Sequence, residues 1–200
     1  LYDITRRMRR KNYDTNRVMT HSHFLIEDVF YNSILIRNNT ILQDIAKEAG
    51  VTIPKSLQSS MNKATKALNE FWDEQTGQYY SNMFVSRERI VEQSLATLLP
   101  LYAGCISKSK ADRLVELLDR HDMFGANYPV PSVPLSSPFF HHRRYWQGPS
   151  WLNTNWLIYD GLKRYGYNDH AELIRTKSLE MVDQSGFHEY FSPVDGYGAG

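Results

Sequence analysis

Residues 145–156 read Tyr-Trp-Gln-Gly-Pro-Ser-Trp-Leu-Asn-Thr-Asn-Trp, and they decide how the rest of the chain is interpreted. Proline is favoured at the first position of a helix, because it has no N–H to leave unbonded and its φ is already helical. We therefore predict a helix from Pro149 to Tyr165, capped by Gly148 and preceded by a loop. Indole rings and amide groups would then project together from the first turns of this helix.

This mixture of side chains is typical of a carbohydrate-binding site. Aromatic rings match the apolar C–H faces of a pyranose, and amide groups match its hydroxyls. The candidate substrate-binding residues are Tyr145, Trp146, Gln147, Gly148, Trp151, Asn153 and Trp156. In the alternative interpretation, Trp151 and Trp156 are core aromatics and Asn153 lies on an exposed turn.

A second aromatic segment, residues 186–200, reads Gly-Phe-His-Glu-Tyr-Phe-Ser-Pro-Val-Asp-Gly-Tyr-Gly-Ala-Gly. Glu189 stands among its aromatic residues. A carboxylate whose pKa is set by partial burial and by its neighbours can accept a proton from water as a general base. Glu189 is therefore the candidate catalytic residue, and the alternative is a solvated carboxylate in a loop.

Composition and charge exclude several kinds of partner. The 200 residues are 42% hydrophobic, enough for a core, and the formal net charge of +1 indicates neither nucleic acid nor a membrane as partner. No apolar run is long enough to span a membrane and no signal peptide is visible, so we expect a cytoplasmic location. Cys105 is the single cysteine, which excludes an intrachain disulfide. His141 and His142 have no third ligand at metal-binding spacing, so we expect no metal and no cofactor.

Helical periodicity fills most of the chain in two alternating forms. Broad apolar stripes, typical of helices buried on more than one side, alternate with the narrow stripes of outer, amphipathic helices. We predict helices over residues 1–11, 24–49, 54–71, 88–102, 109–121, 149–165 and 169–183, and a polar loop over residues 12–22. Alternating inner and outer helices are typical of stacked helical hairpins. The predicted fold is therefore all-α, an α/α toroid of such hairpins.

Long loops join the outer helices to the inner ones, and we expect them to form the functional end of the toroid. Residues 71–80 and 187–197 share an order of aromatic, acidic, turn and aromatic residues, which indicates a degenerate internal repeat. The third loop, residues 122–144, contains four prolines and is predicted to be extended instead of helical.

The two late segments, residues 145–156 and 186–200, resemble glycoside hydrolase family 63. Weaker matches in the right order are Asp28-Val-Phe-Tyr-Asn32, Trp72-Asp-Glu with Thr76-Gly77, and Leu99-Pro-Leu-Tyr-Ala-Gly104. The resemblance implies an (α/α)6 barrel that hydrolyses an α-glycoside with inversion, using two carboxyl groups roughly 6.5 to 9.5 Å apart. Glu189 matches the family's general base, whereas the family's general acid is an Asp in a motif that precedes the equivalent of Leu1.

The resemblance further implies that residues 1–200 are the C-terminal portion of such a catalytic domain, and that this portion alone is inactive. The implied substrate is a small α-glucoside or α-mannoside, for example glucosylglycerate or mannosylglycerate. Gln147 stands where many family members have Arg, which replaces a charge by an amide. Three alternatives stay open: a non-catalytic carbohydrate-binding toroid, a helical-repeat interaction protein, and a toroidal enzyme with another reaction. The oligomeric state stays open too.

Overall fold

A computed structural model describes residues 2–21 and 25–200. Its α-helices are α1 (Tyr2–Arg10), α2 (Thr15–His21), α3 (Val29–Glu48), α4 (Lys55–Ala67), α5 (Leu99–Ala103), α6 (Lys108–Asp119), α7 (Leu152–Arg164) and α8 (Asn168–Ser185), and its 3-10 helices are η1 (Leu68–Phe71) and η2 (Leu95–Leu98). Its short strands pair in antiparallel couples: β1 (Ile26–Glu27) with β4 (Asn82–Met83), β2 (Trp72–Asp73) with β3 (Gln78–Tyr79), and β5 (Tyr190–Phe191) with β6 (Gly198–Ala199). The described chain is mainly helical, as the periodicity predicts.

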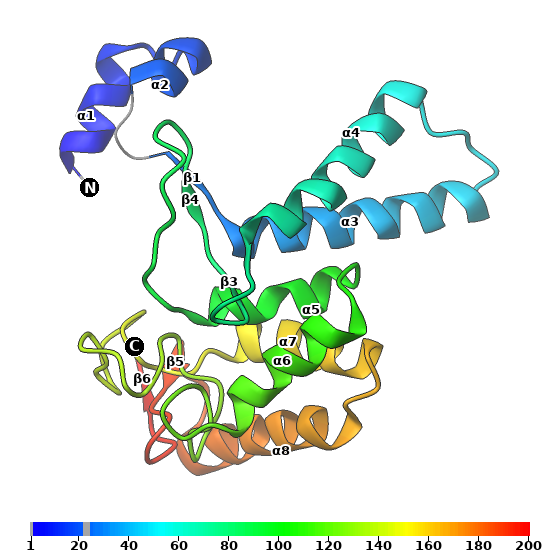
Figure 1. Ribbon diagram of the computed structural model, residues 1–200. Helices are drawn as coiled ribbons and strands as arrows, with labels where there is room; N and C mark the ends of the chain where they lie inside the picture. Colours follow the sequence, from blue (N-terminus) through cyan, green and yellow to red (C-terminus); the bar gives the residue numbers. More distant parts are fainter. Residues whose placement is uncertain (1, 22–24) are drawn as a thin grey trace.

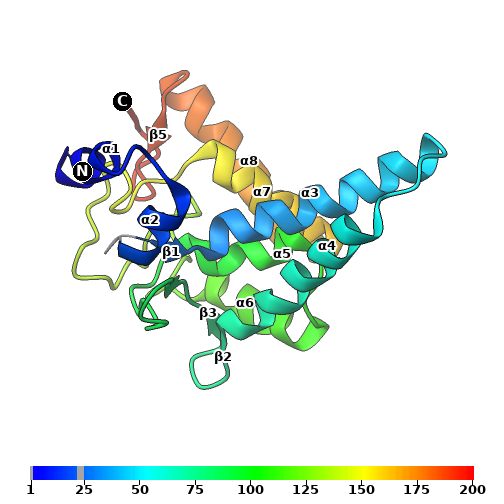
Figure 2. The same ribbon diagram turned by 90° about the horizontal axis from the view of Figure 1, so that it is seen from above.

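The helices from α3 onward form hairpins that stack side by side (Figure 1). Helix α5 lies between α3 and α7, while α4 packs on α3 and α8 packs on α7. Seen from above, α3, α5 and α7 run alongside one another (Figure 2). These three are the inner helices of the prediction and α4, α6 and α8 are the outer ones, so the predicted order of inner and outer helices is confirmed.

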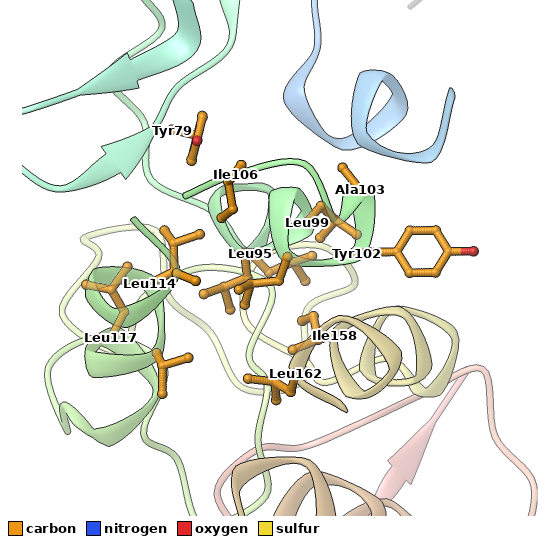
Figure 3. Close-up of a cluster of buried hydrophobic side chains, with 14 of the residues drawn as sticks. Tyr79, Leu95, Leu99, Tyr102, Ala103, Ile106, Leu114, Leu117, Ile158 and Leu162 are labelled. Carbon is orange, nitrogen blue, oxygen red and sulfur yellow. The ribbon is translucent and has the colours of Figure 1, made fainter. Parts of the chain in front are cut away.

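A cluster of buried hydrophobic side chains lies between α5, α6 and α7 (Figure 3). The buried leucine and isoleucine side chains that meet there include Leu95, Leu99, Leu114, Leu117, Ile158 and Leu162. Gly161 of α7 faces the backbone of α5, and a Cβ at that position would lie 2.6 Å from the backbone N of Tyr102. Helices α5 and α7 can approach this closely only because position 161 has no side chain.

The first and last long loops fold alike. Residues 71–80 contain the β2–β3 hairpin and residues 187–197 belong to the β5–β6 hairpin, and each turn has a glycine at positive φ, Gly77 at 69° and Gly196 at 77°. This similarity agrees with the predicted internal repeat. The proline-rich loop over residues 122–144 contains no helix, as predicted.

The helix predicted over residues 88–102 is wrong in its first half. Residues 88–94 are not helical, and the N–H of Ile90 donates to the carbonyl of Ser81 at 2.8 Å. Helical structure begins only at Leu95, where the hydroxyl of Ser94 accepts from the N–H of Ala96 at 3.4 Å. Pairing with the segment around β4 therefore overrides the helical periodicity.

Two boundaries near the start of the chain also differ from the prediction. Residues 15–21 of the predicted polar loop form α2, opened by Asp14, whose carboxylate accepts from the N–H of Arg17 at 2.8 Å. Helix α3 begins at Val29 because Asp28 caps it, with its carboxylate accepting from the N–H of Tyr31 at 2.9 Å. Residues 1 and 22–24 lie outside the described residues, and with them the predicted start of the first helix, the end of the polar loop and the start of the helix over residues 24–49.

The broad apolar stripe of α3 is less buried than predicted. Val29 and Ile36 lie in the core, but Leu35, Leu42 and Ile45 are exposed. No described element covers that face of α3, so the prediction that it is buried on more than one side is wrong for the described chain.

Candidate active site

The two segments singled out in the sequence are joined through their backbones. The N–H of Ser150 donates to the carbonyl of Phe191 at 2.8 Å, and the N–H of Phe191 donates to the carbonyl of Ser150 at 2.9 Å. Ser150 also forms a bridge with Pro131 of the proline-rich loop. Glu189 stands two residues before Phe191 in the sequence. The pairing of Phe191 with Ser150 therefore places the candidate general base beside residues 145–151.

The pairing changes where the following helix begins. Helix α7 starts at Leu152 with Trp151 as its N-cap, later than the predicted start at Pro149. Gly148 is not the cap; its φ is 151°, and a Cβ there would lie 2.6 Å from the carbonyl oxygen of His141. The predicted helix start is wrong because the chain stays extended as far as its pairing with β5, and Gly148 is needed for close packing within the loop.

Four aromatic side chains gather where the two segments meet, and we call Tyr145, Trp146, Trp151 and Tyr190 the aromatic shelf. The indoles of Trp146 and Trp151 stack, with ring centroids 3.9 Å apart and planes 3° from parallel. The rings of Tyr145 and Tyr190 each lie with their centroids 5.1 Å from that of Trp151. Trp151 is buried, whereas Tyr145 is 51% exposed and Trp146 is 40% exposed. The shelf therefore offers open ring surface next to a buried indole.

Sequence reasoning missed Tyr190 as a member of this cluster. The residue follows Glu189 directly, so its position in an aromatic segment was a visible signal. The same segment also holds Phe187, which is 94% exposed, and Phe191, which is fully buried. The alternation of side chains along a strand does not predict which of these rings contacts Trp151. The backbone pairing of Phe191 with Ser150 determines that this ring is Tyr190.

The loop that carries the shelf is strained at Tyr145. Its φ of 44° lies in the left-handed region, which costs roughly 1–2 kcal/mol for a residue with a Cβ. The N–H of His141 donates to the carbonyl of Gln147 at 2.6 Å, and the N–H of Gln147 donates to the carbonyl of Arg144 at 2.8 Å. Residues 141–147 therefore form a loop closed by its own backbone bonds, which holds Tyr145 in this conformation.

The carboxylate of Glu189 is exposed and makes no hydrogen bond or ion pair with any described residue. The end of the hairpin passes close to it, because a Cβ at Gly200 would lie 2.9 Å from the Cβ and 3.2 Å from Oε2 of Glu189. A carboxylate with free lone pairs next to ring surface can accept a proton from a bound water. The role of Glu189 as general base stays a prediction with this geometry in its favour.

Besides Gly148, three of the predicted binding residues make none of the ring contacts of the shelf. Gln147 is partly buried and lines a separate cavity of about 340 Å³. Asn153 is exposed, and its side chain accepts from the next backbone N–H at 2.8 Å. Trp156 is 59% exposed, and its ring lies 6.3 Å from that of Tyr102. The structure therefore brings only part of the predicted set together with the hairpin of Glu189.

Asn155 is a buried amide that holds the scaffold of the site. Its Oδ1 accepts from the N–H of Val130 at 3.0 Å, and its Nδ2 donates to the carbonyl of Pro129 and to the hydroxyl of Ser178, both at 2.9 Å. These bonds tie the proline-rich loop and α8 to α7. Asn155 therefore has all of its strong hydrogen-bonding groups occupied within the protein.

An ion pair lies at the edge of the site, where the Nη2 of Arg143 donates to the Oδ2 of Asp195 at 2.8 Å. Burial alone would raise the pKa of Asp195, but the hydroxyl of Ser192 and the guanidinium of Arg143 outweigh it and hold that pKa below its usual value. Asp195 is therefore ionised at neutral pH.

Neither a metal cluster nor a membrane span is found in the described part of the chain. Among residues 2–21 and 25–200, no group of three or more His, Cys, Asp or Glu side chains is placed to hold a metal ion. Within the same ranges, no helix has both the length and the apolar character needed to cross a membrane.

Stacked helical hairpins whose loops carry ring surface and a carboxylate without a partner among the described residues are the arrangement expected of an α/α toroid that acts on carbohydrates. The chain belongs to the family of mannosylglycerate hydrolase MGH1-like glycoside hydrolase domains, whose family model matches residues 1–200. The resemblance to glycoside hydrolase family 63 is thereby confirmed.

Individual relatives agree with this assignment. A mannosylglycerate hydrolase from Thermus thermophilus is 34% identical over 192 residues, which cover 96% of this chain and 46% of that protein. A glucosylglycerate hydrolase from Mycolicibacterium hassiacum is 26% identical over 198 residues, covering 94% of this chain and 44% of that protein. The crystal structure of a GH63 mannosylglycerate hydrolase from Thermus thermophilus in complex with glucose matches with a TM-score of 0.91 and 34% identity, over 96% of this chain and 48% of that one. This similarity confirms the predicted toroid, and the chain spans about half the length of these relatives.

Proposed function

We propose that the full-length protein is a glycoside hydrolase that inverts the anomeric carbon of a small α-glucoside or α-mannoside, with Glu189 as its general base. The observation that carries the proposal is the reciprocal pair of hydrogen bonds between Ser150 and Phe191, because it places an unpartnered carboxylate beside the aromatic shelf. Relatives named mannosylglycerate hydrolase and glucosylglycerate hydrolase make a sugar joined to glycerate the substrate to test first.

The aromatic shelf supplies the chemistry that a sugar ring needs. The exposed faces of Tyr145 and Trp146 can stack on the C–H face of a pyranose. The Nε1 of Trp151 is buried and has no hydrogen-bond partner among the described residues. Nearly all buried donors in proteins are paired, so this indole N–H is an unsatisfied polar group next to the exposed rings of the shelf.

In the proposed reaction, Glu189 accepts a proton from the water whose oxygen attacks the anomeric carbon. The bond from that carbon to the leaving oxygen breaks, and a general acid gives this oxygen a proton. Inversion requires the two carboxyl groups on opposite faces of the sugar, roughly 6.5 to 9.5 Å apart. We assign the acid to none of the 200 residues, because the family resemblance places it in a motif that precedes Leu1.

The substitution Glu189→Gln in the full-length protein tests the proposal. Glutamine keeps the shape of the side chain but cannot accept the proton, so kcat for mannosylglycerate or glucosylglycerate should fall at least ~10²-fold with affinity retained. Glu116→Gln is the matched control, since Glu116 is an exposed carboxylate on α6 without a partner among the described residues. An unchanged kcat in Glu189→Gln would remove this residue from the mechanism.

Proton NMR of the fresh reaction tests the stereochemistry. An inverting enzyme releases the β-anomer first from an α-glycoside, whereas the α-anomer as first product would exclude inversion. Calorimetry of the wild-type protein with the same glycosides tests the alternatives. Binding without turnover would support a non-catalytic toroid, and neither binding nor turnover would favour a helical-repeat interaction protein.

A further inference from the structure

Two side-chain contacts hold the loop of residues 139–147 against the turn between β5 and β6. The Nδ1 of His142 lies 2.9 Å from the hydroxyl oxygen of Ser192, and the Nη2 of Arg143 lies 2.8 Å from the Oδ2 of Asp195. One partner of each contact lies on the loop that carries Tyr145 and Trp146, and the other lies on the hairpin that carries Glu189. We call these two contacts the clamp.

The turn that receives the clamp is fixed by its own hydrogen bonds. The hydroxyl of Ser192 accepts from the N–H groups of Val194 and Asp195, both at 3.3 Å, and its carbonyl accepts from the N–H of Gly196 at 2.9 Å. The amide of Gln184 on α8 donates to the carbonyl of Asp195 at 3.0 Å. Ser192 itself is buried. The clamp therefore ends on a rigid anchor that keeps a constant position relative to Glu189.

The outer part of the loop has two kinds of contact with the rest of the site: the clamp and the ring contacts of its two shelf residues. Its backbone bonds close residues 141–147 on themselves, so they move as one unit. Its two shelf residues, Tyr145 and Trp146, are both exposed by 40% or more. From this geometry we infer that His142 and Arg143 are positioning residues, which hold Trp146 on Trp151 and so set the distance between the aromatic shelf and the carboxylate of Glu189.

The exposure of the clamp indicates that its contribution is mainly geometric. The side chains of Arg143 and Asp195 are 54% and 34% exposed, and ion pairs of this kind contribute little to stability. A displacement of about 1 Å between a bound substrate and a reacting group can lower a rate by roughly 10²-fold. Loss of the clamp should therefore leave the fold intact and separate ring surface from carboxylate.

Circular dichroism tests the positioning directly, without any substrate. Indoles stacked 3.9 Å apart couple their transitions, so Trp146→Phe should change the circular dichroism of the indole bands, and this difference from the wild-type spectrum defines the exciton couplet of Trp146 and Trp151. The double variant His142→Ala with Arg143→Ala should lose most of this couplet with an unchanged amide I infrared spectrum, which reports the helices independently of the indoles. Arg144→Ala is the matched control, since the side chain of Arg144 is exposed and makes no hydrogen bond or ion pair with a described residue.

The second measurement is turnover of mannosylglycerate and glucosylglycerate by the full-length protein, and this part alone rests on the proposed function. The kcat/KM of the double variant should be about 10- to 100-fold below that of the wild-type protein. The variant Arg143→Lys keeps a cation within reach of Asp195, so its kcat/KM should stay near the wild-type value. A wild-type protein without turnover would contradict the proposed function and leave the spectroscopic result valid.

Two results would overturn the inference. The first is an unchanged couplet in the folded double variant, because Trp146 would then be held by other contacts. The second is a lost couplet with wild-type turnover, because the clamp would then have no catalytic consequence. If the double variant does not fold, the single variant Arg143→Gln decides between the same outcomes.

Discussion

Replacement of Gly161 by Ala should destabilise the protein, although alanine is the better helix former. In an unobstructed helix the change from Gly to Ala gains about 1 kcal/mol. At position 161 the new Cβ would lie 2.6 Å from the N of Tyr102, 2.7 Å from the carbonyl carbon of Leu101 and 2.9 Å from its Cβ. Two of these three atoms belong to the backbone of α5, so they can move only if the helix moves.

The expected size of the effect follows from these distances. Ordinary van der Waals contact of a Cβ begins near 3.4 Å, so α5 has to retreat from α7 by most of an ångström through a close-packed core. Overpacking of this kind costs about 1–3 kcal/mol, and a clash with backbone belongs at the upper end. After the gain in helix propensity is subtracted, the free energy of unfolding should fall by about 2 kcal/mol. For a domain of this size the melting temperature should fall by about 4–8 °C.

Urea unfolding followed by circular dichroism measures this change. Gly166→Ala is a suitable control, because its φ is 82° and nothing lies within 4 Å of the added Cβ. The free energy of unfolding of that variant should fall by only ~1 kcal/mol, the cost of a left-handed backbone for a residue with a Cβ, because the added Cβ meets no neighbouring atom. Gly161→Ala at wild-type stability, or above it, would refute the claim that the α5–α7 contact depends on a missing side chain.

Three further outcomes are expected. Gly148→Ala should weaken sugar binding measured by calorimetry, because its Cβ would lie 2.6 Å from the carbonyl oxygen of His141 and the loop must shift; unchanged affinity would contradict the packing described for that loop. Trp151→Ala should reduce both sugar affinity and melting temperature, since a buried Trp truncated to Ala costs about 3–5 kcal/mol, and normal stability would mean that the indole is not part of the core. The depressed pKa of Asp195 adds stability at pH values above its unfolded-state pKa, and this contribution is lost as the pH falls through the folded pKa, below about pH 4. Asp195→Asn should remove that part of the acid dependence in unfolding curves, and identical acid profiles would show that the ion pair with Arg143 is not formed in solution.

The outer helices could be predicted well because each needs only one apolar stripe, and a stripe is a property of the local sequence. Helices α4, α6 and α8 accordingly lie within a few residues of their predicted positions, apart from the turn of 3-10 helix that ends the first. Residues 88–94 carry the same periodicity and are not helical, because Ile90 bonds to the backbone of Ser81. Hydrophobic periodicity describes one segment at a time, so it cannot show a hydrogen bond to a different segment. The helix start predicted at Pro149 was wrong for the same reason, since the pairing of Ser150 with β5 outweighs the preference of proline for a helix start.

The candidate site shows the same division. Tyr145, Trp146 and Trp151 could be found as a group because they stand close together in one motif. In the structure the two indoles stack and the ring of Tyr145 meets both edge-on. Trp156 follows at helical spacing, yet α7 carries it toward Tyr102 and away from the hairpin. Tyr190 could not be chosen from the sequence, because its selection over neighbouring rings depends on how two distant backbones pair.

The backbone pairing of Ser150 with Phe191 limits how the chain length near the site can change. Glu189 directly precedes β5, so the place of its carboxylate depends on its spacing to the residue that pairs with Ser150. An insertion of one residue between Glu189 and Phe191 would move the carboxylate along an extended chain by about 3.3 Å, and an insertion of two residues by about 6–7 Å. Neither insertion would disturb a helix. Homologues that bind sugars of other sizes should therefore keep the spacing between the residues equivalent to Glu189 and Phe191 constant. Their insertions and deletions should lie outside this hairpin.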